Sequence, residues 1–257
     1  MTSSSPKFFT DSYIMFKRCV TKNLRSPEAV FMAFIVPVVL MVLFGFVFGG
    51  IVDLGEISYI NFIVPGIIVQ CVTNASATTS FSIHNDMSTG IIDRFRSMAI
   101  AKSAVMSGHV WVSVIRSIVI TTVVILTAFA IGFRPTAGLV EWLQVAALLT
   151  LFMIAVTWVV VIFGLIAKDA ESISGTSFLL TILVFLSSAF APTETLPTAL
   201  RIFAENQPMT HVINALRNLL LGFPMDGEFL TAIVWCVGIT VVAFTVSVQI
   251  YKAKLTR

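Results

Sequence analysis

Charged residues are scarce in this chain, and their scarcity excludes a soluble fold. Only 11% of the 257 residues are charged, while 57% are hydrophobic and the mean hydropathy is +0.98. An average soluble domain carries about 25% charged residues. A membrane-spanning helix needs about 20 apolar residues, so the length leaves room for about six spans and no sizeable soluble domain. We therefore expect an all-α membrane protein with six transmembrane helices, formed by a single transmembrane domain over residues 1–257.

Sequence motifs for catalysis and energy supply are also lacking. The three cysteines, Cys19, Cys71 and Cys236, are too far apart to suggest a disulfide framework or a metal site. No G-x-x-x-x-G-K-[ST] phosphate loop occurs, so we expect no enzyme activity and no cofactor in this chain. An ion-driven carrier would place Asp, Glu or Lys near the bilayer midplane, and the cores of the apolar runs contain none. Any driving energy is expected to come from another subunit.

Six apolar runs are present, and the basic residues lie mostly on one side of them. The runs cover about residues 30–52, 57–83, 110–133, 139–167, 173–191 and 229–251. Lys and Arg are enriched on the cytoplasmic side of membrane proteins. If both termini are inside, the cytoplasmic side takes twelve basic residues and the outer side takes Arg134, Arg201 and Arg217. This asymmetry predicts a multi-pass plasma-membrane protein with both termini in the cytoplasm.

The segment before the first span, residues 1–29, has its own pattern. Aromatic and aliphatic residues recur at helical spacing among Lys17, Arg18 and Lys22. This pattern predicts an interfacial helix whose basic face contacts anionic membrane lipid; a soluble amphipathic tail is the alternative. Pro27 follows a capping hydroxyl and precedes an acidic residue, which predicts a helix start at that position.

The outer segment, residues 192–228, is too apolar for an ordinary solvated loop. Pro197, Pro208 and Gly222 interrupt it, so neither half can span the bilayer. We expect two short re-entrant helices that enter the outer leaflet and return, which is tolerated where protein covers the backbone. His211, Asn214 and Asn218 are spaced to lie on one face of the second helix, with Arg217 beside them. This segment is expected to cap whatever lies beneath it.

Polar residues in the second run suggest a substrate route. Gln70, Asn74 and Thr78 are four residues apart and so share a helix face. Buried polar groups are costly in lipid unless they face protein or a wet cavity. The fifth run has a weaker counterpart in Ser174, Ser177, Thr181 and Ser188. Ordinary helix–helix hydrogen bonding is the alternative interpretation.

A stretch that contains several charged residues, 84–108, interrupts the apolar runs. We expect here a short cytosolic helix lying across the ends of two spans, through which another protein could move them. Its candidate coupling residues are Asp86, Gly90, Asp93, Arg94, Phe95 and Arg96. His84 with two of these aspartates could be drawn as a metal or acid–base cluster. A solvated face is favoured, because no second His stands at ligand spacing.

One basic residue, Arg116, lies inside the third run. It is near the cytoplasmic end, where a long side chain can reach the membrane surface. We favour that interpretation over a functional charge pair.

The assembled pattern resembles the permease subunits of ABC-2-type (type V) exporters, most closely the daunorubicin-resistance-like drug exporters. Besides the interfacial helix, three stretches carry the resemblance. They are Phe62-Ile63-Val64-Pro65-Gly66-Ile67, the coupling stretch from Asp86 to Val105, and the outer Leu196-Pro197, Pro208-Met209, Arg217 and Gly222. The family often has Pro soon after the Arg-Ser step, where this chain has Met98-Ala99.

The resemblance implies two permeases, copies or paralogues, paired with two cytosolic ATPase subunits that bind ATP and Mg. Residues 84–108 would contain the coupling helix, and the second and fifth spans would line the export path. Pro208, His211, Asn214 and Arg217 would belong to the outer cap. The aromatic spans fit a hydrophobic or amphiphilic cargo, such as a drug, lipid or glycolipid, and no nucleic acid partner is expected. An ATP-independent channel or scramblase, or a structural subunit that anchors another complex, stays open from the residues alone.

Overall fold

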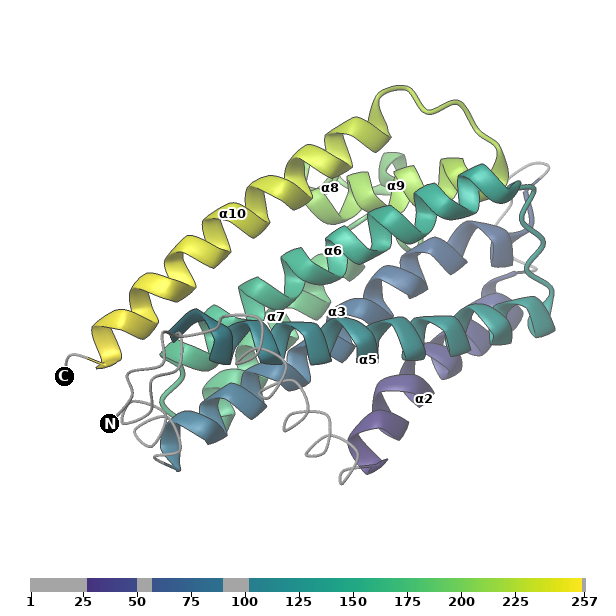
Figure 1. Cartoon of the computed structure of the whole chain (residues 1–257). Coiled ribbons are helices and arrows are strands. Elements are labelled where there is room, and N and C mark those ends of the chain that lie inside the picture. The colour runs from purple at the N-terminus through teal and green to yellow at the C-terminus, as the bar shows by residue number, and fades with distance from the viewer. Residues whose placement is uncertain (1–26, 50–56, 90–101, 256–257) are drawn as a thin grey trace.

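The computed structural model describes residues 27–49, 57–89 and 102–255, and all regular elements within these ranges are helices (Figure 1). This confirms the all-α class. The helices in chain order are α2 (Pro27–Leu43), η1 (Phe44–Phe48), α3 (Tyr59–Ser88), α5 (Lys102–Ile131), α6 (Leu139–Ile166), α7 (Ala170–Phe185), η2 (Thr193–Thr195), α8 (Thr198–Asn206), α9 (Pro208–Leu221) and α10 (Glu228–Leu255).

Among the described residues, four helices are long and apolar enough to cross a membrane, within α3, α5, α6 and α10, and this confirms a multi-pass protein. Two shorter apolar helices occur at Ile35–Phe48 and Ala170–Phe185. The 16 residues of α7 rise about 24 Å at 1.5 Å each, less than a hydrocarbon core of about 30 Å. The arrangement of exactly six spans therefore stays a prediction.

The fifth apolar run forms a shorter helix than its composition predicts. It continues in sequence to residue 191, but α7 ends at Phe185. There the hydroxyl of Ser187 donates to the carbonyl of Val184, and the Leu186 amide closes the last turn on Ile182. Side-chain hydrogen bonds of this kind compete with the helix ladder, so the run turns before its apolar residues end.

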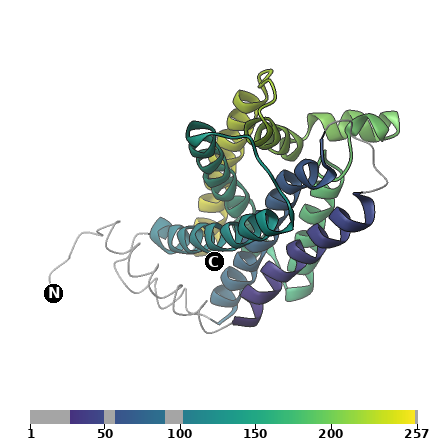
Figure 2. The same ribbon diagram turned by 90° about the vertical axis from the view of Figure 1, so that its right-hand side faces the viewer.

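Helix α3 lies at the centre of the bundle and packs against α2, α5, α6, α7 and α9 (Figures 1 and 2). Two glycines allow its neighbours to approach closely. A Cβ atom on Gly66 would lie 2.6 Å from the backbone of Ala189, and one on Gly164 of α6 would lie 2.7 Å from the carbonyl oxygen of Ser80. Both contacts require the absence of a side chain.

The outer segment contains the two short helices that the sequence predicts. Pro197 precedes the first residue of α8 and Pro208 begins α9, where a missing amide hydrogen costs nothing. Gly222 ends α9 with a left-handed backbone at φ +74°, a conformation that glycine adopts readily. Whether these helices enter the outer leaflet stays a prediction.

The connections between successive helices lie at two opposite ends of the bundle. The turn between α5 and α6 lies beside the end of α9, because the Thr136 amide donates to the Leu220 carbonyl at 2.9 Å. The connection between α6 and α7 lies at the opposite end (Figure 1). Helix α2 is described from Pro27 onward, so its predicted start at that position stays a prediction; the predicted interfacial helix, residues 1–29, lies almost entirely outside the described residues.

Candidate functional site

Helices α3 and α7 place polar side chains together on a partly exposed surface. The hydroxyl of Thr181 donates to Oδ1 of Asn74 at 3.3 Å. The two helices are antiparallel, since Tyr59 at the start of α3 donates to the Phe190 carbonyl beyond the end of α7. Thr78 and Ser177 therefore lie one turn further along in the same direction.

These four residues, Asn74 and Thr78 of α3 with Ser177 and Thr181 of α7, form what we call the polar face. All four are partly exposed, although the surface around them is apolar. Thr78 and Ser177 satisfy their hydroxyls within their own helices, on the carbonyls of Ala75 and Ile173. The polar face can thus accept a new partner without breaking a tertiary contact at those two positions.

Gln70, the fifth residue of the predicted route, lies elsewhere. It is 2% exposed and so is buried within the bundle, whereas the four residues of the polar face are partly exposed. Each residue turns an α-helix by about 100°, so a step of four overshoots one turn by about 40°. Two such steps separate Gln70 from Thr78, and this rotation carries the Gln70 side chain inward. Whether the other residues line a route stays a prediction.

Arg116 of α5 contacts α3 and does not extend to the membrane surface. Its Nη2 donates to the carbonyl of Ala75 at 2.7 Å and to Oγ1 of Thr79 at 3.1 Å. The interpretation that this side chain reaches the interface is therefore wrong. Both acceptors are sequence neighbours of polar-face residues, so Arg116 connects α5 to the back of that face.

Three hydroxyl groups close to Arg116 join α3, α5 and α6. Oγ1 of Thr157 lies 3.3 Å from Oγ of Ser76 and 3.2 Å from Oγ of Ser113, and all three side chains are buried. Contacts of this kind are the ordinary hydrogen bonds of packed membrane helices, worth about 0.6 kcal/mol each. They join the three helices inside the bundle, away from its surface.

Asp86 belongs to a buried pair that the sequence does not reveal. Its Oδ2 lies 3.2 Å from Nε2 of His109 on α5, and the two side chains are 2% and 6% exposed. The prediction of a solvated face is therefore wrong for Asp86. The two residues are far apart in the chain and show no spacing motif, so only the fold brings them together. The described residues contain no cluster of three His, Cys, Asp or Glu that could hold a metal ion.

The remaining coupling residues, Gly90, Asp93, Arg94, Phe95 and Arg96, lie outside the described residues. The ends of the predicted coupling region are helical, however. Helix α3 continues to Ser88 and α5 begins at Lys102. In sequence, the coupling residues therefore lie between two of the longest described helices.

Arg217 of the outer segment is buried among three elements. Its Nη2 donates to the carbonyl of Ser188 at 2.6 Å, its Nη1 to Oδ1 of Asn214 at 2.9 Å, and its Nε to the carbonyl of Phe62 at 3.3 Å. The guanidinium also stacks on the Phe62 ring, 3.9 Å from the ring centre. The hydroxyl of Ser188 completes the network by donating to Asn214 at 2.7 Å. Arg217 thus joins α9 to the start of α3 and to the segment after α7.

His211, another predicted cap residue, lies on a different side of α9. Its Nδ1 is 2.7 Å from Oε2 of Glu228, the first residue of α10. The predicted cap residues therefore divide into two contacts. Asn214 and Arg217 hold α9 to α3 and the segment after α7, while His211 holds it to α10, and Pro208 sets where α9 starts.

Comparisons with known proteins identify the family. The sequence model of the ABC-2 type transporter membrane family matches residues 10–221. The daunorubicin resistance ABC transporter permease protein DrrB1 of Streptomyces coeruleorubidus is 28% identical over 223 residues, covering 86% of this chain and 78% of that protein. The probable doxorubicin resistance ABC transporter permease protein DrrC of Mycobacterium tuberculosis (strain H37Rv) is 24% identical over 240 residues, covering 91% and 86%. The inner membrane transport permease YadH of Escherichia coli (strain K12) is 28% identical over 193 residues, covering 72% and 74%. Since the family match covers most of its length, this chain belongs to the ABC-2 type transporter family.

Proposed function

We propose that the chain is the membrane subunit of an ATP-driven exporter, which moves a hydrophobic or amphiphilic substrate out of the cell and is driven by separate cytosolic ATPase subunits. The relatives described as ABC transporter permeases support the class. The polar face between α3 and α7 is the observation that carries the transport function. It offers hydrogen-bonding groups on the surface of an otherwise apolar bundle.

The surroundings of the polar face favour an amphiphilic cargo. Phe81 of α3 is 39% exposed and Phe178 of α7 is 64% exposed, so large aromatic rings flank the four polar residues. Aromatic and apolar contacts with a few placed polar groups are typical of small-molecule sites. We propose that the polar face of a second permease lies opposite this one and completes the route.

The buried pair Asp86–His109 suggests how force reaches the route. An ATPase that binds the coupling residues would push on the connection between α3 and α5. Because Asp86 and His109 join these helices next to that connection, the two ends would move as one unit. Asp86 would then transmit the movement from inside the bundle and would not contact the ATPase itself.

Arg116 extends this connection toward the polar face. It attaches α5 to α3 at Ala75 and Thr79, each next to a polar-face residue. A tilt of α5 therefore changes the position of Asn74 relative to Thr181. We propose that this displacement alternates the substrate route between inward and outward access.

Reversing the charges of the coupling residues should release the ATPase. In an Asp93→Lys, Arg94→Glu variant, we expect co-purification of a P-loop ATPase in mild detergent to fall by about ten-fold or more, as happens when buried charge pairs at an interface are broken. Lys254→Glu, a charge reversal at the cytosolic end of α10, is the matched control and should leave the complex intact. Equal recovery of the ATPase with both variants would contradict the coupling role.

Removing the Asn74 amide should alter substrate handling with little effect on stability. Asn74→Leu loses one interhelical hydrogen bond, worth about 0.6 kcal/mol, at a partly exposed position. We expect the KM for transport of an amphiphilic drug to change several-fold, while ATPase co-purification stays unchanged. Thr157→Val, which removes buried hydrogen bonds of the same kind, should leave the KM unaltered. The same KM in both variants would argue against a route along the polar face.

A further inference from the structure

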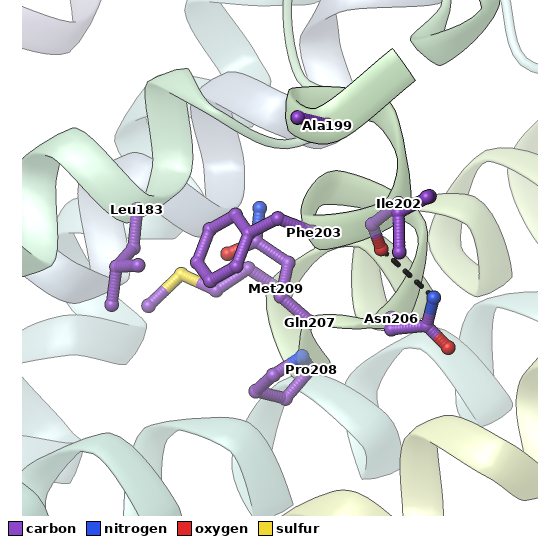
Figure 3. A pocket seen from close by; sticks show the side chains of 8 residues that line it. All are labelled: Leu183, Ala199, Ile202, Phe203, Asn206, Gln207, Pro208 and Met209. Atoms are coloured by element: carbon purple, nitrogen blue, oxygen red, sulfur yellow. Dashed lines mark hydrogen bonds between the residues drawn. The ribbon is translucent and has the colours of Figure 1, made fainter.

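An apolar cavity of about 640 Å³ lies between the end of α7 and the outer helices α8 and α9 (Figure 3). Leu183 of α7 forms one side, Ile202 and Phe203 of α8 the other, and Pro208 and Met209 lie at the start of α9. Its volume falls within the range of about 300–1,000 Å³ that small-molecule sites occupy. None of its eight lining residues is charged.

The cavity is open, and the surface beside it is apolar. Ile202 is 60% exposed and Phe203 is 46% exposed, although both are large apolar side chains. Leu179, one turn before Leu183 on α7, is 61% exposed and extends this surface along α7. The two charged residues of α8 form an ion pair with each other, since Nε of Arg201 lies 2.7 Å from Oε1 of Glu205. A molecule bound in the cavity would therefore contact apolar side chains on both sides and at the opening.

One polar group in the lining lacks a partner. Gln207 is 5% exposed, and its Nε2 donates to the Leu186 carbonyl at 2.8 Å. Its Oε1 accepts no hydrogen bond from any described residue. In Figure 3 the Gln207 carboxamide lies close to the Phe203 ring, within the group of side chains that surround the cavity. Because buried acceptors are normally satisfied, a ligand donor that reaches Oε1 when the ring turns aside would gain a hydrogen bond.

We infer that this cavity binds a neutral, single-chain amphiphile whose headgroup donates a hydrogen bond. The alkyl chain of the amphiphile lies between Leu183 and Ile202, and a hydroxyl or amide of its headgroup donates to Gln207 Oε1. An anionic headgroup is disfavoured, because the lining offers an acceptor oxygen and no cation. This binding does not rest on the proposed export, since the cavity is complete within one chain and needs neither ATP nor a partner.

Photolabelling of the purified full chain in lipid nanodiscs tests the site. The probe is 1-monododecanoylglycerol with a diazirine in its acyl chain, and adducts are mapped by mass spectrometry. We expect saturable labelling of peptides that contain Leu183 and residues 199–209. Unlabelled 1-monododecanoylglycerol should compete at about ten-fold lower concentration than dodecanoate. A ten-fold difference in affinity corresponds to the free energy of about one good hydrogen bond. Equal competition by the two would overturn the proposed headgroup contact.

Two tryptophan variants test the position of the site. Ala199→Trp fills the cavity and should reduce labelling several-fold, whereas Leu200→Trp, at a neighbouring exposed position outside the lining, should not. Gln207→Met should abolish the preference for the neutral competitor while chain labelling persists. Labelling that does not saturate, or that is equal in both tryptophan variants, would show contact with surrounding lipid only and overturn the inference. The competition experiment uses the unaltered chain, so it stands even where a variant fails to fold.

Discussion

Replacing Arg217 by methionine should lower the melting temperature of the purified chain by on the order of 10 °C. Methionine removes the donor to the Ser188 carbonyl and leaves this acceptor buried, whereas the Phe62 carbonyl keeps its partner in the backbone ladder of α3. Each unsatisfied buried acceptor costs about 1–3 kcal/mol. Removing the buried charge offsets part of this loss, since a lone cation is costly to desolvate. We expect a net loss of about 2–4 kcal/mol, because the new side chain makes none of the hydrogen bonds of Arg217.

Lysine at position 217 separates charge from geometry. It keeps the positive charge but has no planar fork, so it can reach only part of the network. We expect Arg217→Lys to fall between wild type and Arg217→Met in thermal unfolding in detergent. Arg201→Met is the matched control, because that arginine is exposed and its ion pair is with Glu205 on its own helix. Equal melting temperatures for the 201 and 217 methionine variants would contradict the assignment of Arg217 as the contact that holds the outer helices.

Alanine at position 66 should be the most damaging addition of a single methyl group to α3. A Cβ at this position lies 2.6 Å from the Cα, Cβ and carbonyl oxygen of Ala189. Since two of these are backbone atoms, no side-chain rotation relieves the contact, and overpacking typically costs about 1–3 kcal/mol. Displacing Ala189 also moves Ser188, whose carbonyl accepts from Arg217. The melting temperature measured in detergent should fall by several degrees.

Gly238→Ala provides the control for this prediction. A Cβ at Gly238 of α10 meets no atom within 4 Å, so the change should be neutral or slightly stabilising. Combining Gly66→Ala with Arg217→Met should destabilise the chain by less than the sum of the two, because both disturb the Ser188 carbonyl. Full additivity would show that the two residues act on separate parts of the structure.

The outer segment shows how much of this fold is readable from local sequence. Pro197, Pro208 and Gly222 define where α8 and α9 begin and end, and each acts through its own backbone restriction. The apolar runs likewise predict the long helices to within a few residues at many of their ends. Other ends differ by more: α5 includes Lys102, well before the third run, and α7 ends before its apolar residues do, where the hydroxyl of Ser187 donates to Val184.

The contacts that organise the candidate site could not be predicted in the same way. One acceptor for Arg116 is the Ala75 backbone carbonyl on another helix, and backbone carbonyls leave no sequence pattern. The pair of His109 with Asp86 depends on which faces of α3 and α5 meet. Gln70 is buried although Asn74 and Thr78 are partly exposed, because a four-residue repeat rotates gradually around the helix. Local rules give the elements, whereas the site depends on their relative orientation.

The most direct measurement is uptake of an amphiphilic drug into inverted membrane vesicles that contain the chain and its co-purifying ATPase. The proposed function predicts that uptake requires Mg-ATP, fails with a non-hydrolysable analogue, and is lost in the Asp93→Lys, Arg94→Glu variant. Equal flux with and without ATP, running down the concentration gradient in both directions, would contradict it and identify the chain as a channel or scramblase.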